Sequence, residues 1–107
     1  MKAVKFLGSA LDDLRAFRKA ARQDMGRQIE RVQRGLEPND WKPMPRVGRG
    51  VREIRIRTES NAYRTLYVTS IAETVYVLHV FVKKSRQTPK KDIDLAKSRL
   101  KTIREQL

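Results

Sequence analysis

Three runs between residues 51 and 84 decide the fold: VREIRIR (51–57), AYRTLYV (62–68) and VYVLHVFVKK (75–84). Each run is rich in β-branched and aromatic residues, which favour extended backbone, and a short polar segment separates it from the next. Connections this short favour antiparallel neighbours, so we predict three consecutive strands of a mainly antiparallel sheet. The third run is apolar at odd and even positions alike, which is typical of an interior strand or of one covered on both faces.

Cationic side chains lie inside these strands or at their ends, where charge is costly unless something requires it. Alternation puts Glu53, Arg55 and Arg57 of the first run on one face of the sheet and Ile54 and Ile56 on the other. Guanidinium and ammonium groups bind phosphate oxygens well. The pattern therefore predicts a phosphate-binding surface, to which the strands contribute Arg55, Arg57, Arg64, Lys83 and Lys84.

The composition of the whole chain indicates an anionic partner. Its 107 residues include 25 Lys and Arg against 12 Asp and Glu, a formal net charge of +13. Such an imbalance makes a compact chain repel itself, and the phosphates of nucleic acid would relieve that repulsion. An acidic protein, an anionic membrane surface or a generic solubility surface are the alternatives. The length fits one domain spanning residues 1–107.

Several functional classes have no support in the sequence. The chain has no cysteine, one histidine, no carboxylate cluster at ligand spacing and no glycine-rich phosphate loop, so we expect neither a metal nor a cofactor. The N-terminus resembles a signal peptide only superficially, because Lys5 interrupts its apolar run and Asp12 follows closely. The lack of cysteine suits a reducing cytoplasm, and no segment is long enough to span a membrane, so we expect a cytoplasmic protein without membrane contact.

The first 36 residues predict a short strand and a helical hairpin. Residues 2–7 alternate in part, and the stretch from Ser9 to Asp12 has the form of a capping box. Apolar residues then recur at helical spacing in two stretches, the second from about residue 22 to 34. Gly35 is placed to end that second helix, and Leu36 would complete its apolar stripe.

Residues 37–50 hold three of the four prolines and predict a loop, and residues 83–88 predict a basic turn. Thr88 would be the N-cap of a last helix, whose apolar stripe runs to Leu107 and docks on the sheet or on a partner. The predicted order is β-α-α-β-β-β-α. This is an α+β fold, with a sheet of about four strands packed on a helical hairpin and a C-terminal helix.

Cleavage of RNA would require little additional chemistry, because the 2′-hydroxyl is an internal nucleophile. Arg64 and Arg55 could stabilise the charge of the phosphorane, and Lys84 could neutralise the leaving oxygen. Glu53 is the carboxylate inside the basic strand block, and it is either a candidate base or an ion-pair partner of these arginines. His79 is either a hydrogen-bonded core histidine or a general acid or base.

A second group of residues is expected to contact RNA without taking part in its cleavage. It comprises Lys83, Arg57, Arg52, Tyr63, Arg86, Arg49 and Arg46. Tyrosine and tryptophan side chains could stack on bases, as they do in proteins that bind single-stranded RNA, with core packing as the alternative for Tyr67 and Tyr76.

Taken in order, these motifs resemble the RelE/ParE toxin superfamily and, within it, the HigB-like phage-derived branch. The stretches that carry the resemblance are QRGLEP (33–38), GVREIR (50–55), YRTLY (63–67), VLHVFVKKS (77–85) and TP (88–89) before a helix with Ala96. The resemblance covers nearly the whole chain. It implies a RelE-like fold and a toxin of a type II toxin–antitoxin pair.

The resemblance also implies an activity and partners. Toxins of this kind usually cleave mRNA on the translating ribosome without a metal, and the antitoxin is usually a helix-turn-helix DNA-binding protein. Arg64 matches the principal phosphate-stabilising arginine, Lys84 the basic residue that ends the last strand, and Arg55 the basic position in the preceding strand.

One departure from the family pattern is informative. RelE-type members carry a tyrosine at the start of the last helix, whereas residues 88–93 read TPKKDI here. Proton transfer then falls to another group, or the activity differs. The superfamily also includes gyrase poisons of the same fold, and a non-catalytic nucleic-acid binder is a third reading.

Overall fold

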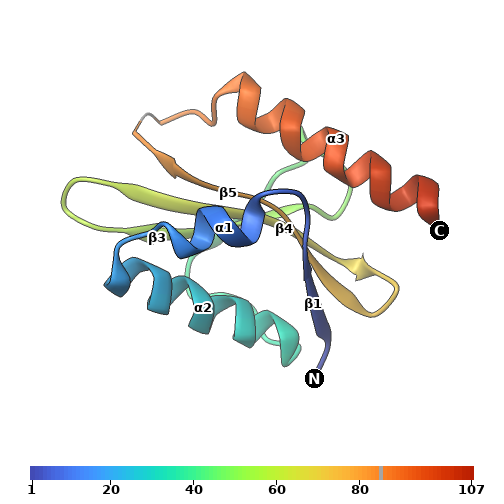
Figure 1. Ribbon diagram of the computed structural model, residues 1–107, viewed down its shortest axis with the longest axis horizontal. Coiled ribbons are helices and arrows are strands. Elements are labelled where there is room, and N and C mark those ends of the chain that lie inside the picture. The colour runs from blue at the N-terminus through green and yellow to red at the C-terminus, as the bar shows by residue number, and fades with distance from the viewer. Residues whose placement is uncertain (85) are drawn as a thin grey trace.

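A five-stranded mixed sheet lies between two helical layers in the computed structural model, which describes residues 1–84 and 86–107. The elements are β1 (Ala3–Phe6), α1 (Ala10–Arg15), α2 (Lys19–Gln33), β2 (Trp41–Pro43), β3 (Arg52–Arg57), β4 (Ala62–Ile71), β5 (Thr74–Lys83) and α3 (Lys90–Gln106). The strand order is β1-β5-β4-β3-β2, with α1 and α2 on one face and α3 on the other (Figure 1). Only β1 and β5 pair in parallel, so the predicted α+β, mainly antiparallel fold is confirmed.

The three predicted strands form the centre of this sheet, and their side chains alternate between its faces. Arg55 of β3 lies opposite Arg64 of β4, which in turn lies opposite Phe81 of β5. The neighbouring position Ile56 pairs with Tyr63, and both are buried on the α2 side. All the charged positions of β3 and β4 that were predicted to share a face therefore lie on the α3 side.

Each face of the sheet has its own apolar core. On one side Leu14 and Met25 pack with Val77 of β5, and on the other Leu78 of β5 packs with Leu100 of α3. Because β5 is covered on both faces, its continuous apolar pattern is explained and its predicted interior position is confirmed. The last helix docks on the sheet with the stripe Ile93, Ala96, Leu100 and Ile103, whereas Leu107 is 70% exposed.

The main departure from the predicted elements is β2, because a three-residue strand lies within the segment predicted as a loop. Trp41 pairs with Ile54, and Lys42 pairs with Glu53, which makes β2 the edge strand next to β3. The prolines that predicted a loop are compatible with such an edge, because proline cannot donate to a further neighbour. The sheet therefore has five strands rather than about four.

Helix boundaries follow the sequence with four corrections. Helix α2 begins at Lys19, three residues before the predicted start. Gly35 ends it as predicted, with a φ of +82° and its amide donating to the carbonyl of Val32, but Leu36 is 50% exposed instead of joining the stripe. Ser9 makes no capping contact with a backbone amide and donates instead to the carboxylate of Asp13.

The fourth correction concerns the start of α3. Thr88 does not cap this helix, which begins at Lys90 after Pro89. Its hydroxyl donates instead to a carboxylate oxygen of Glu53 on β3, at 3.3 Å. The predicted basic turn precedes it, and Ser85 of that turn lies outside the described residues. Among the described helices, none combines the length and apolar character that crossing a bilayer requires.

Candidate phosphate-binding site

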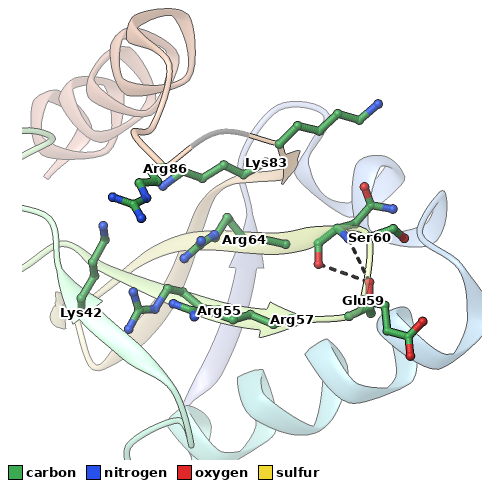
Figure 2. Close-up of a pocket in the computed structure, with 12 residues that line it drawn as sticks. Lys42, Arg55, Arg57, Glu59, Ser60, Arg64, Lys83 and Arg86 are labelled. Carbon is green, nitrogen blue, oxygen red and sulfur yellow. Dashed lines mark hydrogen bonds between the residues drawn. The ribbon is translucent and has the colours of Figure 1, made fainter.

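An open cleft of about 460 Å³ lies on the α3 side of the sheet, beyond the part that α3 covers. Figure 2 shows Arg55 and Arg64 on neighbouring strands at its floor, with Lys42 and Arg86 reaching in from other segments. The cations that line the cleft are Lys42, Arg55, Arg57, Arg64, Lys83, Lys84 and Arg86. Among the described lining residues, the acidic one is Glu59 at the β3–β4 turn. Six of the cations predicted to bind or cleave RNA are thus brought together, and Lys42 joins them.

Two carboxylates compensate for the opposed arginines at the floor of the cleft. Like charges directly opposite each other on neighbouring strands repel, and Arg55 and Arg64 are register partners. Asp40 accepts two hydrogen bonds from Arg55, from Nε at 3.0 Å and from Nη2 at 2.8 Å. Arg64 Nη1 donates to Glu53 Oε1 at 2.9 Å. Each arginine is therefore held by its own acid and keeps further N–H groups for a ligand.

Glu53 lies beneath the cleft rather than on its surface. Its side chain has no exposed area, and one carboxylate oxygen bonds Arg64 while the other accepts from Thr88. Lys42 Nζ lies 4.0 Å from the same oxygen that Arg64 binds. Burial lowers the pKa of Arg64, and the charge of Glu53 opposes that effect. The expected pairing of Glu53 with a strand arginine is therefore present, with Arg64 as the partner.

Lys83 and Lys84 differ sharply although they are adjacent. Lys83 pairs with Ala62 at the end of β5 and is 3% exposed, whereas Lys84 is exposed. Burial lowers the pKa of Lys83, and the neighbouring charge of Arg64 lowers it further. Within residues 1–84 and 86–107, no acceptor receives a hydrogen bond from the Lys83 ammonium. The charge of Glu53 opposes these effects, but the oxygens of Glu53 bond Arg64 and Thr88 rather than Lys83. A buried ammonium without a hydrogen-bond acceptor is costly, so this lysine is suited to an anionic ligand.

Two predicted RNA contacts lie on the opposite face of the sheet. Tyr63 is 3% exposed and packs edge-on against Phe17, with ring centroids 4.7 Å apart. Arg52 stacks over the ring of Trp41 at 4.2 Å. Neither residue lines the cleft. Tyr67 and Tyr76 are also buried, which agrees with the core-packing alternative.

The remaining predicted residues lie around the cleft or away from it. Arg46 lines a smaller groove that shares Lys42 and Arg86 with the cleft, whereas Arg49 lines a separate depression around Trp41. His79 is buried, with Nε2 2.6 Å from a carboxylate oxygen of Asp92 on α3. His79 is therefore the hydrogen-bonded core histidine that was one of its two predicted roles, and it lies outside the cleft lining.

Among the described cations that line the cleft, Lys42 is the one that residue patterns did not single out. It lies on β2, and a three-residue strand between prolines leaves no periodic signal in the sequence.

Acidic and histidine side chains do not gather into a group of three or more at any place in the described part of the chain, so no metal-binding cluster is assigned.

The fold is a small α+β domain with a cleft lined by cations on one face of its sheet. The model of the family described as phage-derived protein Gp49-like (DUF891) matches residues 12–101. The chain therefore belongs to the Gp49-like phage-derived family, which is part of the RelE/HigB-like toxin family. No curated protein matches the chain. The predicted resemblance is thus confirmed at the level of the family, and a toxin family implies an antitoxin partner.

Proposed function

We propose that this protein is the toxin of a toxin–antitoxin pair and that it cleaves mRNA on translating ribosomes. Family membership supports the toxin role. The observation that carries the proposed activity is the pair formed by Arg64 and Lys83, two nearly buried cations at one open cleft. Lys83 has no acceptor among the described residues, and a phosphate would supply one. Phosphoryl chemistry is promoted by such preorganised charge.

The proposed reaction uses the RNA as its own nucleophile. The 2′-oxygen attacks the adjacent phosphorus, the bond from phosphorus to the 5′-oxygen breaks, and the products are a 2′,3′-cyclic phosphate and a 5′-hydroxyl. Arg64 stabilises the charge on the phosphorane, while Arg55 and Arg57 hold neighbouring phosphates. Lys83 protonates the leaving 5′-oxygen. The proton lost by the 2′-hydroxyl passes to water, to which the cleft is open.

No carboxylate acts as the base in the proposed reaction. Glu53 remains a predicted catalytic residue, but its full burial and its two hydrogen bonds favour an orienting role. Glu59 lines the cleft at the turn, away from Arg64 in Figure 2. Lys84 stays a predicted site residue at the cleft margin.

The test is a translation extract programmed with one reporter mRNA. We expect added toxin to cut the message inside its reading frame, leaving cyclic phosphate ends, and to spare the same message when translation is blocked. The control variant is Lys97→Ala, which removes an exposed cation of α3 outside the cleft and should therefore cut the message as the unaltered toxin does. Intact mRNA at saturating toxin would refute the proposal, and inhibited DNA supercoiling in a parallel assay would then favour a gyrase poison.

A pH profile tests the role of Lys83. If the ammonium protonates the leaving oxygen, cleavage falls as the pH rises through the pKa of Lys83. Burial holds that pKa below the ordinary 10.5, so the fall should begin earlier than for an exposed lysine. Lys83→Arg keeps its proton at any usable pH, so the fall should move upward or vanish. Rates measured from neutral pH upward with both proteins decide this, and identical profiles would exclude Lys83 as the acid.

A further inference from the structure

The segment that leads into α3 is joined to the cleft arginine by a chain of buried hydrogen bonds. Thr88 Oγ1 donates to Glu53 Oε2 at 3.3 Å, and Glu53 Oε1 accepts from Arg64 Nη1 at 2.9 Å. Thr88, Glu53 and Arg64 are 7%, 0% and 6% exposed. None of these contacts is required for the helix itself, since Thr88 makes no N-cap bond.

We propose that Thr88 and Glu53 are positioning residues: Thr88 fixes the Glu53 carboxylate, and Glu53 fixes the plane of the Arg64 guanidinium at the cleft. The effect on catalysis rests on the proposed RNA cleavage, whereas the effect on Arg64 itself does not. A carboxylate bonded through one oxygen can rotate and let its partner move. A donor at the second oxygen removes that freedom.

Repulsion at the cleft makes such a device necessary. Arg55 and Arg57 lie on the strand beside Arg64, and both lower its pKa, as a nearby like charge does. The same repulsion would push the guanidinium outward toward solvent if Glu53 did not hold it. Thr88 and Glu53 therefore keep Arg64 in a place that its cationic neighbours oppose.

A second buried contact also holds the start of α3, without involving Thr88. Asp92, in the first turn of the helix, lies 2.6 Å from Nε2 of His79 on β5. Ile93, one residue later, is buried in the apolar core beneath the helix. Removing the Thr88 hydroxyl should thus leave α3 docked and change only the position of Glu53 and Arg64.

The test compares Thr88→Val, which keeps the shape and loses the hydroxyl, with Thr88→Ser, which keeps the hydroxyl. The matched control is Thr102→Val, because the Thr102 hydroxyl bonds the carbonyl of Ser98 on the exposed side of α3. Hydrogen exchange of the Arg64 side-chain N–H groups by NMR reports its position without any RNA. Cleavage rates resolved into kcat and KM report the consequence.

We expect Thr88→Val to speed exchange at Arg64 and to lower kcat roughly tenfold with little change in KM. Thr88→Ser should restore both quantities, and Thr102→Val should alter neither. Unchanged exchange at Arg64 in a folded Thr88→Val protein overturns the inference, whatever happens to cleavage. If wild-type protein cleaves no RNA, the proposed function fails and the exchange data still decide the positioning role. Should Thr88→Val not fold, Glu53→Gln replaces it, with faster exchange expected and wild-type exchange contradictory.

Discussion

Arg64→Ala is expected to lower mRNA cleavage by about 100- to 1,000-fold, the usual cost of losing one preorganised donor at a charged transition state. It should also lower the free energy of unfolding by about 3–5 kcal/mol, because Glu53 would be left as a buried charge without its partner. Quantified cuts in a translation extract and denaturant unfolding at matched pH measure the two effects.

A double variant separates these two effects. Replacing Arg64 by methionine and Glu53 by leucine removes both charges from the buried pair, so most of the lost stability should return. Cleavage should not return, since the phosphorane would still lack its guanidinium. A double variant that regains cleavage would show that the single substitution acts through folding alone. Wild-type cleavage by Arg64→Ala would remove Arg64 from the mechanism.

Lys83→Met is expected to lower cleavage by about 100-fold or more, the range found for a lost proton donor. At the same time it should raise the free energy of unfolding, because a buried ammonium without an acceptor among the described residues is replaced by an apolar chain of similar length. Loss of activity with gain of stability is a combination that misfolding cannot produce. Cleavage assays and thermal unfolding on the same preparation test it.

Lys84→Met is the matched control for that experiment. Lys84 has the same charge and adjoins Lys83 in the chain, but it is exposed. We expect its replacement to weaken cleavage only slightly and to leave stability nearly unchanged. The opposite ranking, with Lys84 essential and Lys83 dispensable, would support the residue that the family resemblance singled out and would contradict the geometric assignment.

The order of apolar and charged residues predicted the central strands because successive side chains of a β-strand point to opposite faces of the sheet. Period two placed Arg55 on the opposite face from Ile54, and burial of the isoleucine face fixed the phase of β3. The same rule could not choose between Lys83 and Lys84. Strand β5 is apolar on both faces, so its sequence does not indicate which of its residues face which side of the sheet. Its register with β4 also contains two irregularities.

Two misses at the site, Thr88 and Lys42, arise from tertiary contacts that local rules do not encode. Thr88 before Pro89 has the sequence of a helix cap, yet its hydroxyl bonds Glu53, 35 residues earlier in the chain. Lys42 reaches the cleft because β2 pairs with β3, and three residues are too few for a periodic signal. In both cases the site depends on which distant segment lies opposite.

The parallel pairing of β1 with β5 has a consequence for biosynthesis. The first strand of the chain has its partner at Thr74–Val77, about 70 residues later, so a growing chain holds β1 unpaired until most of the protein has been made. Contacts of such long separation form late and slowly. Lys83 and Thr88 emerge later still. The sheet that carries the cleft therefore cannot assemble until most of the chain has been made.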